Sequence, residues 1–461
     1  MKLHHVFRLS LAVLCSLALC GRASAQDNGE EDPPFSQPIA GVEIDAAGVL
    51  RTKQLDPRVA QERLLAARQA QNAEVMQPSQ LRKVSLTRLE QAVAAAIERG
   101  ERPSDEMLSM AGLTGIQYVF FYPESRDVVI AGPAEGAFRD PMGRYLGIRS
   151  GQPIMQLEDM VTALRAYGPG SKPTSVISVS IDPTPEGLAR MQQFLASVRG
   201  RVQPGDARVL ANALKQNLGL QTVTLKGIPQ ATNFARVLVE ADYRMKLIGI
   251  GLERLPIPTQ SYIERSTAAQ GSANAMERWY FVPNYEGVTI SEDGLAMKLN
   301  DRGVKLVGES ERVDGAGNRA GGGRVNRASE AFCRDFTNHY AAIAQRVPVY
   351  AELRNLIDAS IAAAYIQQQD FYGQAEWSLA VFGDEAHFPI ETHGAPAQVE
   401  TAVNAVWKGN TLLTPLGGGI HMQPRQALRS DRLVSETDGA SDAVKQLAAP
   451  ADLAEGQWWW D

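Results

Sequence analysis

Apolar residues recur at three- and four-residue steps in several stretches of the chain, which is the spacing of one face of an α-helix. The clearest case is Leu86, Leu89, Val93 and Ile97, with Gly100 placed to cap the C-terminal end. The same periodicity, together with capping residues, predicts further helices over 57–75, 157–166, 185–198 and 206–218.

Short runs rich in aromatic and β-branched residues lie between these helices. The runs 117–122 and 127–131 flank a tight polar connection and predict a β-hairpin. Further strands are predicted over 174–181 and 222–226, and a shorter hairpin over 42–50. Because helices and strands alternate from about 105 to 252, this part of the chain is predicted to form an α/β layer on a mixed sheet.

The stretch 222–253 combines a strand, a loop and a helix in one α/β unit. Thr232 is placed to cap a helix whose apolar positions form a single stripe. We expect the helix to end near Tyr243, because the Ile- and Gly-rich segment 246–251 favours a strand. The alternative is one helix that continues to Ile248.

The pattern changes after residue 256. Prolines followed by small polar residues mark the segment 256–276 as a boundary. Two amphipathic helices joined at 346–348 predict an antiparallel αα-hairpin. Four alternating runs divided by polar turns predict an antiparallel β-meander over 278–282, 288–291, 295–300 and 304–313.

The predicted fold class is therefore α+β: a mixed-sheet α/β domain followed by an antiparallel β-meander and a helical hairpin. Apolar periodicity is low from about residue 394, so the tail is expected to be only partly ordered. The predicted divisions are a signal peptide (1–25), a disordered leader (26–40), the α/β domain (41–255), the meander with the hairpin (277–370) and the tail (371–461).

The first 25 residues have the composition of a secretory signal peptide. Lys2 and Arg8 precede the apolar run 9–20, and small residues precede an expected cleavage after Ala25. The run is shorter than the about 20 residues that a membrane-spanning helix needs. A rival interpretation is a lipoprotein modified at Cys20, although a bulky leucine stands before it. The protein is predicted to be secreted or periplasmic, without a permanent membrane span.

Charge and cysteine content disfavour several classes of partner and cofactor. The formal charge is −6, and removal of the three basic residues of the signal peptide lowers it to −9. An acidic chain without a long basic run has little electrostatic attraction for nucleic acid. Of three cysteines, Cys333 is the one outside the signal peptide, which excludes an intramolecular disulfide and a four-cysteine zinc site in the mature chain. No cofactor is predicted.

The sequence contains no phosphate-binding loop, HExxH or GxSxG motif. The best metal candidate is the set Glu385, His387, Glu391 and His393, which a strand would place on one face. A strand separates His387 from Glu391 by about 13 Å, however, which is too far for one zinc ion. Pro389 breaks a helix that would bring them together, so a folded loop would have to form the site. The alternative is that these are solvated loop residues.

Two polar clusters are candidates for a binding site. Asp182 and Glu186 follow the end of a predicted strand, where α/β sheets bind ligands, although helix capping and first-turn charge also explain them. Asp242, Tyr243 and Arg244 could line a groove, with ordinary surface ion pairing as the alternative.

Three consecutive tryptophans are the least ordinary feature of the tail. Exposed indoles at Trp458, Trp459 and Trp460 could anchor a protein or cell-envelope partner. The alternative is that they dock on the body of the protein.

Seven short segments carry a likeness to a known family: LRKVSL (81–86), AGPAEG (131–136), SIDPT (180–184), VEADYRMKLIG (239–249), FVP (281–283), GVKL (303–306) and VYAELRNLI (349–357). In these segments the chain resembles a family of secreted planctomycete proteins, and the resemblance covers about residues 40–370. That family is known only as a domain of unknown function. The resemblance therefore implies an exported bacterial protein, and it implies no activity or catalytic residues.

The expected function is that of a non-catalytic binding or scaffolding protein of the cell envelope, since export, an acidic composition and missing catalytic motifs agree with it. The alternative is a secreted hydrolase with a non-standard site built from acids and histidines.

Overall fold

The computed structural model describes residues 41–461 with short gaps. The predicted signal peptide and leader, 1–40, lie outside the described residues. The gaps are 55, 70–73, 199–202, 268–274, 285–287, 300–302, 314–318, 322–325, 405, 409–410, 414–418, 437–438, 448–449 and 451–452.

Among the described residues, the larger sheet has nine strands and is mixed. The pairs β15–β2 and β10–β18 are parallel, whereas the other pairs in this sheet are antiparallel. In spatial order its strands are β1 (Gly41–Ile44), β2 (Val49–Lys53), β15 (Gln398–Val399), β9 (Gln221–Lys226), β8 (Ile177–Pro183), β18 (Gly419–Met422), β10 (Ala275–Pro283), β13 (Val304–Val313) and β14 (Arg319–Gly321).

The second sheet has seven strands and contains the predicted hairpin of 117–131, which the antiparallel pair β4–β5 confirms. In spatial order its strands are β19 (Val434–Ser435), β11 (Val288–Ile290), β12 (Ala296–Leu299), β4 (Tyr118–Tyr122), β5 (Asp127–Ala134), β3 (Ser79–Ser85) and β20 (Trp459–Trp460). Two small hairpins are formed by β6 (Ala137–Arg139) with β7 (Tyr145–Gly147), and by β16 (Val406–Lys408) with β17 (Thr411–Leu413).

The predicted fold class α+β is confirmed, but the predicted β-meander is wrong. The four strands form, yet they do not pair in chain order. β10 pairs with β13 in the larger sheet, whereas β11 and β12 pair with each other and extend β4 in the second sheet. Alternation of polar and apolar residues identifies a strand, but it does not specify the partner across the sheet.

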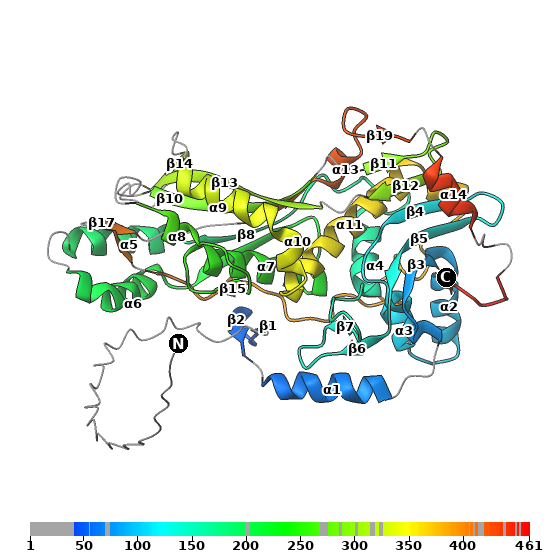
Figure 1. The fold of residues 1–461 in the computed structure, drawn as a ribbon, viewed down its shortest axis with the longest axis horizontal. Helices are drawn as coiled ribbons and strands as arrows, with labels where there is room; N and C mark the ends of the chain where they lie inside the picture. The colour runs from blue at the N-terminus through cyan, green and yellow to red at the C-terminus, as the bar shows by residue number, and fades with distance from the viewer. Residues whose placement is uncertain are drawn as a thin grey trace, which may run out of the picture. The chain divides into compact units, whose positions relative to one another are not determined.

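The helices pack around these two sheets (Figure 1). Among the described residues, no helix is long and apolar enough to cross a membrane. The helices are α1 (Pro57–Gln69), α2 (Leu86–Glu98), α3 (Asp105–Leu108), α4 (Leu157–Ala166), α5 (Pro185–Val198), α6 (Ala207–Leu218), α7 (Asn233–Gly249), α8 (Tyr262–Arg265), α9 (Arg327–Asn338), α10 (Tyr340–Ala344), α11 (Pro348–Gln368), α12 (Phe371–Gln374), α13 (Pro424–Ala427) and α14 (Ala440–Gln446). Short 3-10 turns occupy Glu74–Met76, Met110–Gly112 and Pro204–Asp206.

Helix α7 is longer than the expected helix of the 222–253 stretch. It begins after Thr232, whose hydroxyl accepts from the Ala235 N–H, and it continues to Gly249. The predicted strand over 246–251 is therefore wrong, and the alternative of a continuing helix holds. All residues of α7 except Arg236 are buried, so packing on every side outweighs the weak helix preference of the Ile- and Gly-rich segment.

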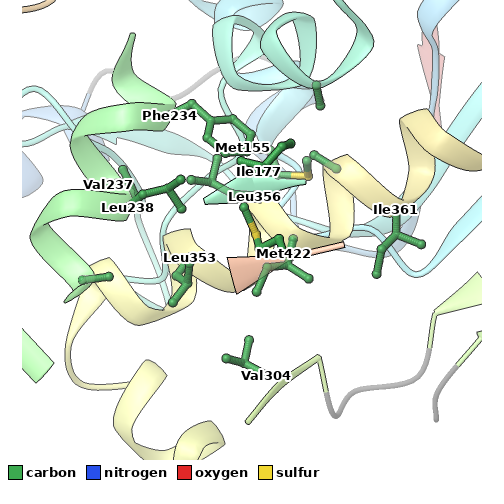
Figure 2. Close-up of a cluster of buried hydrophobic side chains, with 14 of the residues drawn as sticks. Met155, Ile177, Phe234, Val237, Leu238, Val304, Leu353, Leu356, Ile361 and Met422 are labelled. Atoms are coloured by element: carbon green, nitrogen blue, oxygen red, sulfur yellow. The ribbon is translucent and has the colours of Figure 1, made fainter. Parts of the chain in front are cut away.

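Helix α11 is buried along most of its length. It packs against α4 and α7, whereas α9 packs on β13. The predicted αα-hairpin is therefore limited to the start of α11, where the Phe336 and Tyr350 rings lie 5.5 Å apart. Figure 2 shows the apolar contacts between α7 and α11, with Phe234, Val237 and Leu238 of α7 close to Leu353 and Leu356 of α11.

The segment 371–461 takes part in both sheets. It supplies β15 and β18 to the larger sheet, and β19 and β20 to the second. These strands have two to four residues each, too few to show a period of two in the sequence. Both sheets also contain strands from either side of residue 256.

Candidate functional site

A network of buried charges lies where α7, α11 and the β6–β7 turn meet. Arg144, in that turn, is 2% exposed and is held between two carboxylates. Its Nη2 donates to Glu240 Oε2 of α7 at 2.5 Å, and its Nε donates to Glu352 Oε2 of α11 at 2.9 Å. Asp140 shapes the turn by accepting from the backbone N–H groups of Met142 and Arg144, each at 2.8 Å.

Helix α7 extends the network by one turn. Arg244 follows Glu240 at i,i+4 spacing, with 3.4 Å between Nη1 and Oε1. The Nη2 of Arg244 donates to Glu253 Oε1 at 2.6 Å, just beyond the end of the helix. The guanidinium groups are thus satisfied by carboxylates inside the protein, as buried charges require.

The pKa shifts distinguish a carboxylate that favours the ionised form from carboxyl groups that favour the protonated form. Burial would raise the pKa of Glu240, but Arg144 and Arg244 beside it lower it. Burial raises the pKa of Glu352, against the opposing effect of Arg144. The pKa of Asp159 is raised well above its ordinary value by burial and then by the neighbouring Glu158. Glu240 is therefore the anionic centre of the network.

Asp159 borders a small polar cavity of about 10 Å³ next to this network. Its Oδ2 accepts from Asn233 Nδ2 at 2.9 Å, whereas its buried Oδ1 has no hydrogen-bond partner among the described residues. The buried Oδ1 of Asn355 likewise has none, and Asn355 and Glu352 line the same cavity. A cavity of this size has room for one water-sized particle.

Asp242 lies at the centre of a second, separate charge cluster. It is fully buried, with its Oδ2 3.2 Å from Lys246 Nζ. Lys246 also donates to the Ile181 carbonyl at 3.0 Å, at the end of β8. The next residue, Asp182, pairs with Arg278 of β10 at 3.1 Å. Burial raises the pKa of Asp242 to about 6, against the opposing effect of Lys246.

The structure brings together only part of the predicted binding residues. Asp182 and Asp242 face the same cluster, while Arg244 belongs to the network of Glu240. Glu186 is exposed at the start of α5, and Tyr243 is buried at 3% exposure. The predicted groove of 242–244 is therefore wrong, and so is its alternative of surface ion pairing, because all three side chains lie in the core.

The four metal candidates lie in the irregular segment after α12, and each of the two histidines has its own partner. His387 Nδ1 lies 2.5 Å from Asp384 Oδ2, and His393 Nε2 lies 3.0 Å from Glu158 Oε2. Glu385 pairs with Arg165, and Glu391 is exposed. In the part of the chain that the structure describes, no group of three or more histidine, cysteine, aspartate or glutamate side chains is placed to hold a metal ion.

Arg165 lies beside an open cleft of about 460 Å³ at the end of α4. It donates to the carbonyls of Phe382 and Phe388, both at 2.6 Å, so its donors are turned toward the protein. The rest of the wall is formed by Gly168, Pro169, Ser378, Leu379, Gly383 and Asp384.

A buried carboxylate holds the segment 377–382, which contributes Ser378 and Leu379 to this wall. Glu90 of α2 is 6% exposed and accepts from the backbone N–H groups of Val381 at 2.8 Å and Phe382 at 2.7 Å. It also accepts from the Trp377 indole. These three bonds fix an irregular segment in which Leu379 has a φ of +56°. The cleft is therefore preformed rather than created by a loose loop.

The three tryptophans of the tail pack on the second sheet. Trp458 and Trp460 are buried, and β20 pairs with β3. The Arg82 guanidinium lies 4.4 Å from the Trp459 ring centroid and donates to both carboxylate oxygens of Asp461. Docking on the body is thus the correct alternative, and exposed indoles are not available to anchor a partner.

Sequence reasoning missed Arg144, Asp159, Lys246 and Glu352. One signal was present, since Glu240 and Arg244 have the i,i+4 spacing of a helical ion pair. That spacing cannot tell a buried pair from a solvated one, and the other partners come from distant segments.

A match to a known protein family lies in the centre of the chain. A family model described as a protein of unknown function (DUF1598) matches residues 179–262, which run from β8 through α7 to the start of α8. No curated protein and no solved structure matches the chain. The matched segment supplies Glu240, Arg244 and Glu253 of the buried network. Residues 179–262 are thus found to be a DUF1598 domain, whose function is unknown.

Proposed function

We propose that the protein is an exported, non-catalytic binding or scaffolding protein of the cell envelope, and that its ligand occupies the cleft beside Arg165. The observation that supports this proposal is the preformed cleft of about 460 Å³, a volume in the range of small-ligand sites. The strongly perturbed acids, by contrast, lie in buried clusters that offer no such space.

The chemistry of the cleft favours a ligand with a positively charged group. Arg165 is already paired with Glu385 and two carbonyls, so it offers little to an anion. A backbone hydrogen bond from Ala386 and then His387 lower the pKa of Asp384, which keeps this carboxylate charged at the rim. Leu379 and Pro169 add a small apolar surface. A lysine-bearing peptide segment of an envelope component fits these features.

Binding of a lysine-containing tetrapeptide, measured by isothermal titration calorimetry, tests the proposal. We expect Asp384→Asn to weaken binding about tenfold by removing a charge partner, and Ser378→Trp to abolish it by filling the cleft. Glu391→Gln, an exposed change outside the cleft, is the matched control and should bind normally. Equal affinity for a glutamate-containing tetrapeptide, or unchanged binding by Ser378→Trp, would overturn the proposal.

Export is tested separately. Cleavage after Ala25 gives a mature chain that begins at Gln26, so N-terminal sequencing of the protein from an envelope or culture fraction should start there. Recovery of the intact N-terminus in the cytoplasmic fraction would contradict export.

A hydrolase remains the second candidate because His393 and Glu158, both about one-quarter exposed, form a pair of the kind used in acid–base catalysis. Hydrolysis of p-nitrophenyl acetate that is lost in His393→Ala, but kept in His387→Ala, would favour the enzyme. Equal background rates for wild type and both variants would count against it.

A further inference from the structure

We propose that helix α1 and the β6–β7 hairpin form a docking surface for an anionic membrane. Exposed arginines of this surface contact lipid phosphate groups, and exposed apolar side chains of α1 enter the boundary between headgroups and acyl chains. The docking surface is distinct from the cleft beside Arg165, and it does not depend on the function proposed for that cleft.

The first observation is a local excess of positive charge on an acidic protein. The whole chain has a formal charge of −6. In 56–69 and 137–150, by contrast, the exposed charged side chains are five arginines and two carboxylates. They are Arg58, Arg63, Arg68, Arg139 and Arg149, with Asp56 and Glu62. Because salt screens charges beyond about 8 Å, this local balance rather than the total charge decides what the docking surface attracts.

The second observation is that these arginines are not neutralised by the protein. No carboxylate forms an ion pair with any of the five in the part of the chain that the structure describes. Exposed arginines elsewhere do have such partners, since Arg99 pairs with Glu101 at 2.8 Å and Arg429 pairs with Asp431 at 3.0 Å. Guanidinium groups bind phosphate oxygens through parallel hydrogen bonds, so the five arginines favour a phosphate-bearing partner.

Backbone carbonyl groups hold two of the arginines in place. Arg63 Nη1 donates to the Asp140 carbonyl at 2.9 Å, and Arg68 Nη2 donates to the Ile148 carbonyl at 3.0 Å. These bonds fix α1 along the β6–β7 hairpin, as Figure 1 shows. A guanidinium group has five N–H donors, so each arginine keeps donors for an oxyanion while its position is already set. The docking surface is therefore organised before a ligand arrives.

The apolar side chains of α1 select a membrane over a polyanion in solution. Val59 and Leu65 are 41% and 48% exposed, and none of the described side chains of α1 is buried. At 3.6 residues per turn, the half-buried positions 60, 64 and 67 share one face, and Arg58, Val59, Leu65 and Ala66 lie on the opposite face. A dissolved polyanion makes no use of these apolar groups. Helices that lie in a membrane interface use both basic and apolar side chains.

Flotation of the chain 26–461 with lipid vesicles tests the proposal. We expect the protein to bind vesicles made of equal parts phosphatidylglycerol and phosphatidylcholine. Binding to vesicles of phosphatidylcholine alone should be at least about tenfold weaker, because the arginines require anionic headgroups. Absence of binding to the anionic vesicles, or equal binding to both compositions, would overturn the proposal.

Charge variants locate the docking surface. The pair Arg58→Gln and Arg149→Gln removes two side chains that make no hydrogen bond to described residues, and it should weaken binding to anionic vesicles about 25-fold. The matched control, Arg99→Gln with Arg429→Gln, removes two paired charges and should bind within about twofold of wild type. Glu62→Gln removes a carboxylate from the docking surface and should strengthen binding about fivefold. Equal losses in the two double variants would contradict the assignment.

An apolar variant distinguishes lipid from a dissolved polyanion. Leu65→Ser should weaken binding to anionic vesicles at least about threefold, since it removes apolar area that enters the interface. Leu447→Ser, at a leucine that is 67% exposed outside the docking surface, is the matched control and should bind normally. Unchanged vesicle binding by Leu65→Ser, together with equally tight binding of polyphosphate, would assign the surface to a dissolved polyanion and overturn the membrane proposal.

Discussion

Lys83 illustrates how one buried amine links the stability of the protein to pH. It lies on β3 with 2% exposure, and its Nζ is 3.3 Å from the Tyr122 hydroxyl and 3.2 Å from the Lys445 carbonyl. Burial lowers the pKa of Lys83 from 10.5 to about 8. Below pH 8 the folded protein must therefore keep a buried charge that the unfolded chain exposes to water.

The sign of the effect follows from proton binding. Between pH 8 and 10.5 the unfolded chain keeps the Lys83 proton and the folded protein releases it, so the free energy of unfolding rises with pH. Relative to Lys83→Met, we expect wild type to gain up to about 3 kcal/mol across this range. Urea unfolding of both proteins at a series of pH values measures the difference. Parallel pH profiles would contradict the assigned shift.

Arg144 is expected to be the most costly single charge to remove. Arg144→Met leaves Glu240 and Glu352 buried without the partner that both contact. Removing one partner of a buried ion pair typically costs about 3–5 kcal/mol. Chemical denaturation at pH 7 measures the loss. The matched control is Arg126→Met, which breaks the exposed pair with Glu376 and should cost less than about 1 kcal/mol.

These residues also mark the limit of what the sequence reveals at this scale. Asp182 and Asp242 were both candidates for a site, and the structure does bring them into one cluster. Glu240 and Arg244 have the i,i+4 spacing of a helical ion pair, and they do pair on α7. Their burial depends on α11 and on the β6–β7 turn, which approach from distant parts of the chain. Local spacing contains no information about such neighbours.

At the scale of elements, the contact between α7 and β10 depends on a missing side chain. A Cβ at Gly249 would lie 2.4 Å from Trp279 Cζ3, inside van der Waals contact. Trp279 is fully buried, and its indole N–H donates to Ser329 at 2.9 Å, so the ring has little freedom to move. The glycine at the end of α7 therefore allows the helix to approach the sheet closely.

Gly249→Ala should accordingly destabilise the protein, although alanine favours a helix. Overpacking of a filled core costs about 1–3 kcal/mol, which exceeds the gain of about 1 kcal/mol in helix propensity. Differential scanning calorimetry measures the change in Tm. Gly205→Ala is the control, because its Cβ would meet open space. A Tm equal to or above wild type in Gly249→Ala would show that Trp279 can move aside.

Elements differ in how far they could be predicted. Helix α2 has a serine cap and spans Leu86–Glu98, which agrees with the predicted apolar stripe from Leu86 to Ile97. The paired runs of β4 and β5 were equally clear. The end of α7 was mispredicted because burial on all sides removes the periodicity that marks a surface helix. Strands as short as β15, β19 and β20 have no periodicity to detect.

At the scale of the whole molecule, the two sheets join segments that are far apart in the chain. In the larger sheet, β18 from the tail separates β8 from β10, and β15 separates β2 from β9. In the second sheet, β12 pairs with β4, and β20 pairs with β3. One continuous hydrophobic cluster includes Leu86, Trp279 and Trp458. The local patterns predicted domains that follow one another along the chain, whereas each sheet combines strands from distant segments.

Because of this interleaving, we expect both sheets to unfold in one cooperative transition. Trp279 is a buried residue of β10 in the larger sheet, and Trp460 is a buried residue of β20 in the second. Urea unfolding followed by circular dichroism should coincide with fluorescence of a Trp460→Phe variant and of a Trp279→Phe variant, which report different tryptophans. A fragment of residues 41–255 lacks β12, which pairs with β4, and β18, which pairs with β8, and should fail to fold alone. Separate transitions, or a fragment with a cooperative melt of its own, would instead support the predicted division near residue 256.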